Sequence, residues 1–146
     1  MNIYPISNCR FIAGLTGVGA ATYSTRWSSK GIYILYTAAT PSLALLESVV
    51  HISKLPVTGS CMMVLDIQEI AIADLPLNWQ QYSPPDILKK WGNEFVKYNK
   101  AVALKLPSAI MPEEYNYLSN SSSTNFKKVK ITGKRPLPID DRLMKK

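Results

Sequence analysis

The sequence has few of the residues that build metal sites and cross-linked frameworks. Its 146 residues include one histidine and two cysteines. Cys9 and Cys61 stand in no CxxC pair and near no histidine cluster, which argues against both a disulfide framework and a zinc site. Because His51 is the single histidine, we also expect no histidine-based metal centre and no metal among the functional groups.

Long apolar runs are also missing. The apolar stretches have the length of strands, far below the roughly 20 residues that a membrane helix needs. The start, MNIYPISNCR, lacks the basic region and apolar core of a secretory signal. We therefore expect a cytoplasmic protein with no membrane contact. A chain of this length that is 47% hydrophobic suits a single compact domain over residues 1–146.

Acidic residues are outnumbered, with 10 Asp and Glu against 17 Lys and Arg and a net charge of +7. From Asp74 onward, thirteen basic residues face seven acidic ones, so the excess lies in the second half. A basic half suits an anionic partner such as a nucleic acid, an acidic protein surface or a phosphorylated small molecule. A solvated basic face with no partner is the plain alternative.

Strands and helices alternate without a regular repeat, which indicates the α+β class. The β-branched and aromatic run GIYILYT predicts a strand over Gly31–Thr37, apolar on both faces and therefore covered on both sides. The same reasoning predicts strands over three further segments: Cys61–Ile67, Ala101–Pro107 and Phe126–Thr132. The lysines of the last segment should keep an exposed sheet edge soluble.

Two helices have recognisable starts. Thr40 and Pro41 fit the N-cap and first position of a helix over Pro41–His51. Ser83 should cap a second helix beginning at Pro84. The second helix should bury an apolar stripe made by Ile87, Leu88, Trp91, Phe95 and Tyr98.

Glu47 is the unexpected residue of the first helix. Its neighbours are almost all apolar, and burying a carboxylate without a partner is costly. A partner such as Arg26, or a ligand hydroxyl, would solve this, although Glu47 could equally lie at the solvent edge of the helix. Tyr36 could be a core residue, and Arg26 could stack on Trp27 at the surface.

Several segments together resemble the RES-domain family, the toxin half of bacterial toxin–antitoxin pairs. The N-terminal part carries LTGVGA, then RW, then LYTAATPSLALLESVVH. The second half carries LKLPSAIMPEEYNYLSN and the ending PLPIDDRL. The resemblance implies an ADP-ribosyltransferase-like fold with mostly antiparallel sheets flanked by helices.

The resemblance also implies an activity, the cleavage of the bond between nicotinamide and ribose in NAD by hydrolysis or phosphorolysis. NAD would be the substrate, and no cofactor would be needed. By position in the motifs, Glu47 and Arg26 would be catalytic, and the substrate-binding residues would be Tyr36, Ser108 and Asn120. Read without the resemblance, Ser108 is simply a turn residue after a strand.

The resemblance implies partners as well: an antitoxin with a helix-turn-helix domain, through which alone DNA would be contacted, and a toxin homodimer. Two alternatives stay open. One is an ADP-ribosyltransferase that modifies a macromolecule through the same pocket. The other is a non-enzymatic basic module that binds nucleic acid, suggested by the lysines between Lys127 and Arg135.

Overall fold

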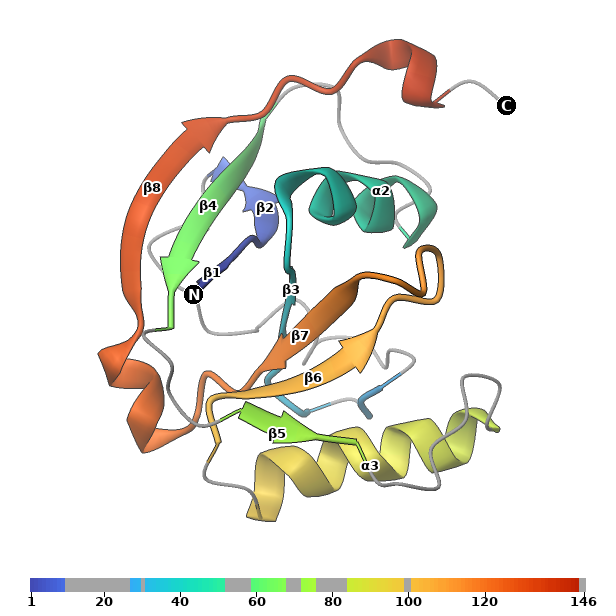
Figure 1. Ribbon diagram of the computed structural model, residues 1–146, viewed down its shortest axis with the longest axis vertical. Helices are drawn as coiled ribbons and strands as arrows, with labels where there is room; N and C mark the ends of the chain where they lie inside the picture. Colours follow the sequence, from blue (N-terminus) through green and yellow to red (C-terminus); the bar gives the residue numbers. More distant parts are fainter. Residues whose placement is uncertain are drawn as a thin grey trace.

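The computed structural model describes residues 1–9, 27–29, 31–51, 59–67, 72–75, 84–98 and 101–144 (Figure 1). The first of its two sheets is built around β4 (Ser60–Asp66). All of its pairings are antiparallel: β4 pairs with β1 (Asn2–Ile3), β2 (Ile6–Asn8) and β8 (Lys130–Pro136). The predicted strand over Cys61–Ile67 is therefore confirmed to within one residue at each end.

The second sheet has the strand order β3-β7-β6-β5. The central strands are β7 (Tyr115–Ser119) and β6 (Ala103–Pro107), and the edges are β3 (Leu35–Ala38) and β5 (Ile72–Asp74). The pair β5–β6 is parallel, and the other two pairs are antiparallel. The mostly antiparallel α+β class predicted from the sequence is thus confirmed.

The helix α2 (Pro41–His51) lies next to the first sheet, and the helix α3 (Pro85–Tyr98) lies next to the second (Figure 1). Leu43 and Ala44 of α2 pack with Met62 of β4. Leu88 and Phe95 of α3 pack against one face of the second sheet. The other face of that sheet packs against the first sheet through a cluster of Ile3, Cys61, Met63, Leu65, Ile67, Ala103 and Tyr117. Both helices and both sheets therefore contribute side chains to a buried cluster.

Some expected elements differ in extent. The strand expected over Gly31–Thr37 covers only Leu35–Ala38, because its partner β7 ends at Ser119, opposite Leu35. Coverage on both sides was also wrong, since Tyr36 is 39% exposed. In α3, Ile87 and Tyr98 are exposed and do not belong to the buried stripe. The expected cap Ser83 lies outside the described residues.

The strand expected over Phe126–Thr132 is partly a 3-10 helix, η2 (Thr124–Lys128). Ser123 caps this turn by accepting a hydrogen bond from the Asn125 backbone N–H, so β8 starts only at Lys130. The strand β8 is exposed along its length and carries Lys130, Lys134 and Arg135 at a sheet edge. A short 3-10 helix, η3 (Asp141–Met144), follows.

The absence of a disulfide was a wrong inference, because Cys9 and Cys61 are bonded to each other. The strand pairing explains the bond: Asn8 pairs with Ser60 and Ser7 with Cys61, which brings Cys9 beside β4. This register involves residues more than 50 positions apart and has no local signature in the sequence. In the part of the chain described here, no helix is long and apolar enough to cross a membrane.

Candidate active site

Glu47 lies on α2, and the local sequence fixes where that helix begins. The Thr40 hydroxyl accepts a hydrogen bond from the Leu43 backbone N–H at 3.1 Å, which confirms Thr40 as the cap. The same hydroxyl donates to Glu114, so the start of α2 is also tied to the loop that precedes β7. The Glu47 side chain is half-buried, between the buried Leu43 and Ala44 and the exposed Val50.

The Glu47 carboxylate meets two donors that are distant in the sequence. Its Oε1 accepts a hydrogen bond from the Ser108 hydroxyl at 2.6 Å. It also accepts one from the Asn116 side-chain Nδ2 at 2.6 Å. A distance of this length is typical of a hydroxyl that donates to an ionised carboxylate. Two of the groups that bind the partly buried Glu47 are therefore neutral donors, one in the loop after β6 and one on β7.

Ser108 follows β6 and is fully buried. Its hydroxyl oxygen accepts hydrogen bonds from the backbone N–H groups of Ile110, at 3.1 Å, and Met111, at 3.0 Å. A hydroxyl has one proton and two lone pairs, and here the proton goes to Glu47. All of its bonding capacity is used within the protein, and one of the three bonds holds the Glu47 carboxylate.

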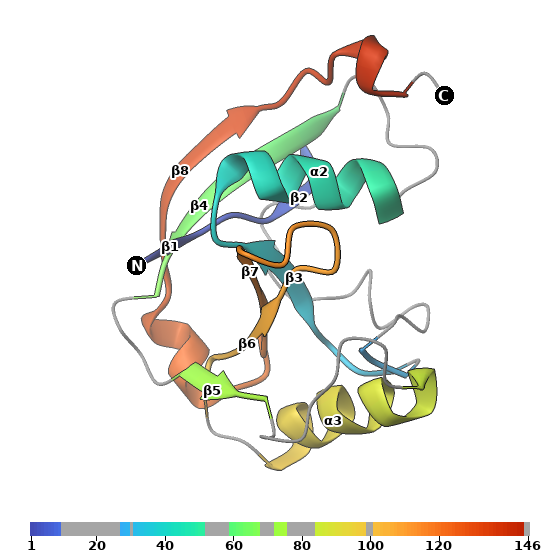
Figure 2. The same cartoon turned by 45° about the vertical axis from the view of Figure 1, so that its right-hand side comes forward.

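The loop that carries Ser108 runs beside α2 (Figure 2). It connects β6 to β7, and Asn116 is the second residue of β7. The carboxylate of Glu47 is thus fixed from three elements: the helix, the loop and the central strand.

Tyr36 shares a face of the second sheet with Asn116. On β3 and β7, Tyr36 lies opposite Leu118, and Ala38 lies opposite Asn116. Side chains two positions apart on a strand point to the same face. The partly exposed Tyr36 ring is therefore on the side of the sheet where Asn116 meets Glu47.

Two candidate residues remain to be placed. Arg26 lies outside the described residues, which begin again at Trp27. Asn120 is buried past the far end of β7, where its Nδ2 donates to the Val96 carbonyl at 3.3 Å and its Oδ1 accepts from the Ser122 N–H at 3.1 Å. Asn120 thus lies between β7 and η2, and its side chain ties this connection to α3.

The sequence reasoning missed Asn116. It stands four residues before Asn120 in the segment LKLPSAIMPEEYNYLSN, of whose two asparagines only Asn120 was predicted to bind substrate. A usable signal was present, since asparagine is depleted in strands and this one shares a sheet face with Leu118.

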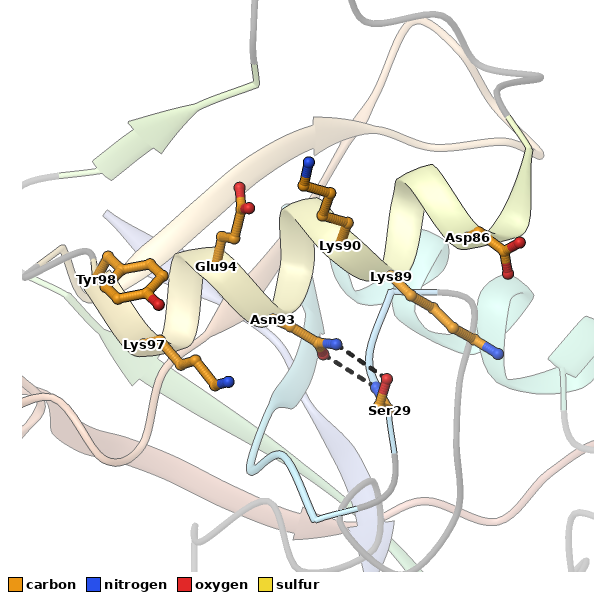
Figure 3. A pocket seen from close by; sticks show the side chains of 8 residues that line it. All are labelled: Ser29, Asp86, Lys89, Lys90, Asn93, Glu94, Lys97 and Tyr98. Carbon is orange, nitrogen blue, oxygen red and sulfur yellow. Dashed lines mark hydrogen bonds between the residues drawn. The ribbon is translucent and has the colours of Figure 1, made fainter.

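A surface hollow of about 420 Å³ lies elsewhere, on the outer face of α3 (Figure 3). Its lining mixes Lys89, Lys90 and Lys97 with Asp86 and Glu94. It also contains Ser29 and Asn93, which are hydrogen-bonded to each other. Among the predicted site residues that the structure describes, none lines this hollow. Among the described residues, no group of three or more His, Cys, Asp and Glu side chains is placed to hold a metal ion.

Known proteins resemble the chain along most of its length. Residues 4–140 match the model of the family described as the RES domain. A Toxin Res of Yersinia enterocolitica is 33% identical over 138 residues, which cover 86% of this chain and 88% of that relative. A Toxin Res of Photorhabdus laumondii is 31% identical over 153 residues, covering 99% and 98%.

A third relative, from Sphingobium, bears the name Prs ADP-ribosylating toxin and is 30% identical over 141 residues, covering 90% and 88%. Among solved structures, the fold resembles a chain in the crystal structure of the M. tuberculosis MbcT-MbcA toxin-antitoxin complex. The TM-score is 0.72 at 12% sequence identity, over 93% of this chain and 83% of that chain.

Proposed function

The chain belongs to the RES domain family, and we propose that it is the toxin of a toxin–antitoxin pair that degrades NAD by cleaving the nicotinamide–ribose bond. The observation that carries the proposal is the Glu47 carboxylate, held at one oxygen by Ser108 and Asn116. Both donors are neutral, so they stabilise an anion without neutralising it. An oriented anion is what a reaction through a cationic sugar requires.

In the proposed reaction, nicotinamide leaves as a neutral molecule and positive charge develops at the anomeric carbon of the ribose. Glu47 stabilises that charge and bonds the ribose hydroxyls. Tyr36 packs on the nicotinamide ring, and its partial exposure on the same side of the sheet supports this position. Arg26, which the family resemblance implies is catalytic, binds the pyrophosphate or orients the ribose in this scheme, because its guanidinium suits oxyanions. An oxygen of water or phosphate then bonds to the anomeric carbon, water losing a proton to solvent, and no added cofactor is needed.

Ser108 has a different place in this scheme from the one expected. Its proton is already donated to Glu47, and its oxygen already accepts two backbone N–H groups. It therefore holds the carboxylate and does not bond the ribose or the carboxamide. In the proposal Asn120 does not contact the substrate either, because its side-chain amide is hydrogen-bonded to the backbone of Val96 and Ser122.

A second reaction has a specific observation in its favour. The relative named Prs ADP-ribosylating toxin is 30% identical to this chain. Transfer of ADP-ribose to a macromolecule would use the same Glu47 and the same leaving group, and only the acceptor would differ. The partner that belongs to the proposal is an antitoxin with a helix-turn-helix domain, and the likeness to a chain of a toxin–antitoxin complex is consistent with it.

The test follows the adenine-containing half of the substrate. Purified protein is incubated with adenine-labelled NAD in phosphate and in phosphate-free buffer, with and without cell extract. We expect nicotinamide release and a soluble labelled product, either ADP-ribose or ADP-ribose phosphorylated at the anomeric carbon. Label on a macromolecule would instead establish the transferase. Unchanged NAD under all conditions would overturn both reactions.

A further inference from the structure

Asn116 makes one strong hydrogen bond and leaves its other polar atom unused. Its Nδ2 donates to Glu47 at 2.6 Å, and the opposite amide orientation would set two acceptor oxygens against each other. The remaining Oδ1 is buried and has no hydrogen-bond partner among the described residues. A buried carbonyl without a partner is destabilising, so this amide is kept for a purpose other than the stability of the strand.

The surroundings of Asn116 support the same conclusion. On its face of the sheet, the directly opposed residues are Ala38 on β3 and Leu106 on β6, and Leu118 follows on β7. An apolar side chain at position 116 would suit these neighbours and would leave no orphan acceptor. The single polar contact that asparagine provides here is the one to Glu47.

The position of Asn116 in the sheet suits it to fix the orientation of the Glu47 carboxylate. It is paired on both sides, with β3 and with β6, near the centre of the second sheet. Glu47 is carried by a different element, α2, and its side chain has several rotatable bonds. A donor on the sheet therefore removes rotamers that the helix alone would allow. Ser108 adds a second donor from the loop, and both bonds restrict the orientation of the carboxylate.

We propose that Asn116 is a positioning residue that orients the Glu47 carboxylate toward the ribose during cleavage. This inference rests on the proposed function. Since Asn116 acts through Glu47, its loss should affect the charge-stabilising step and should leave the binding of NAD largely unchanged. The expected signature is a fall in kcat with little change in KM.

The test compares Asn116→Leu with the wild type, with kcat and KM for NAD measured beside the melting temperature. Leucine keeps the approximate volume and removes the donor. We expect kcat to fall roughly 10- to 100-fold, the range of a lost hydrogen bond to a charged group, while KM changes less than about threefold. Glu113→Gln, an exposed carboxylate in the loop between β6 and β7, serves as the control and should retain wild-type kinetics.

Asn116→Asp separates orientation from folding. When it is protonated, the introduced carboxyl can donate to Glu47 as the amide does, and when it is ionised it cannot. The kcat of this variant relative to the wild type should therefore decline as the pH rises, while that of Asn116→Leu should stay uniformly low. A role in folding alone would produce no such difference.

The outcomes distinguish the inference from the function it rests on. If the wild type consumes NAD and folded Asn116→Leu keeps wild-type kcat, the positioning role is wrong and the proposed function stands. A rise in KM at unchanged kcat would also overturn it, because Asn116 would then bind substrate directly. If the wild type leaves NAD intact, the proposed function fails and the inference fails with it.

Discussion

Asn93 on α3 uses both ends of its amide, whereas Asn116 on β7 uses one. The Oδ1 of Asn93 accepts from the Ser29 backbone N–H at 3.0 Å, and its Nδ2 donates to the Ser29 hydroxyl at 2.9 Å (Figure 3). The amide of Asn116 donates to a carboxylate and leaves Oδ1 buried without a partner. The first arrangement satisfies its groups and holds two segments together. The second leaves a group unsatisfied in order to act on Glu47.

The region around Asn93 has a second structural constraint. The next residue along the chain toward the N-terminus is Gly92, where an added Cβ would lie 1.7 Å from the Trp27 carbonyl oxygen. The helix therefore approaches the backbone of residues 27–29 more closely than any side chain would allow. This contact fixes the segment that directly follows Arg26 in the sequence. In this region the polar and steric constraints both serve to position the backbone.

The largest expected effect on stability is that of Gly92→Ala. The added methyl group must displace backbone, so we expect the free energy of unfolding to fall by about 3 kcal/mol or more. The roughly 1 kcal/mol that alanine gains in helix propensity is too small to offset this loss. Chemical denaturation would measure this loss. Gly133→Ala is the control, since its nearest contact would be a Val64 methyl at 3.2 Å, and it should cost far less. Equal stability of the two variants would contradict the close approach at Trp27.

A smaller loss is expected for Asn93→Ala. It removes two hydrogen bonds to Ser29, each worth about 0.5–1.5 kcal/mol, so a total near 2 kcal/mol should appear in the free energy of unfolding. Asn116→Leu should cost less, because it also removes an unsatisfied buried carbonyl. If Asn116→Leu lowered the free energy of unfolding more than Asn93→Ala does, the view that Asn93 serves stability and Asn116 does not would be wrong.

The smallest effect is expected at Asp140, whose carboxylate accepts hydrogen bonds from the Arg142 side chain and backbone. These bonds hold the pKa of Asp140 below its usual value. A lowered pKa in the folded state stabilises the fold above the usual aspartate pKa, and the stabilisation disappears as the pH falls through the lowered one. Both side chains are exposed, so screening by water reduces the effect.

Asp140→Asn should therefore melt within experimental error of the wild type at neutral pH, and the two curves should coincide in acid. A loss of stability at neutral pH as large as that of Asn93→Ala would contradict this order, because the exposed Asp140–Arg142 pair would then stabilise the fold as much as the Ser29–Asn93 hydrogen bonds do. Thermal melts between pH 3 and pH 7 provide the measurement.

Local patterns predicted the parts of the fold that local chemistry determines. The pair Thr40–Pro41 identified the start of α2, and the β-branched and apolar runs identified β4 and β6. The isolated carboxylate of Glu47 was recognised because burial without a partner is costly. The association of Ser108 with the same site came from the family resemblance, since 61 residues separate the two.

The features that were missed all depend on pairing between distant segments. Asn116 lies 69 residues from Glu47, and only the register of β7 against β3 and β6 brings it there. The Cys9–Cys61 bond depends on the register of β2 against β4. No periodicity in the sequence encodes these registers.

The most direct test of the account is nicotinamide release from NAD by the wild type and by Glu47→Gln, measured at equal concentrations of folded protein. Glutamine keeps the shape of the side chain and removes its charge. We expect steady release by the wild type and a loss of at least about 100-fold in the variant, because the substitution removes a principal charge-stabilising group. Release at similar rates by both proteins would contradict the central role of Glu47.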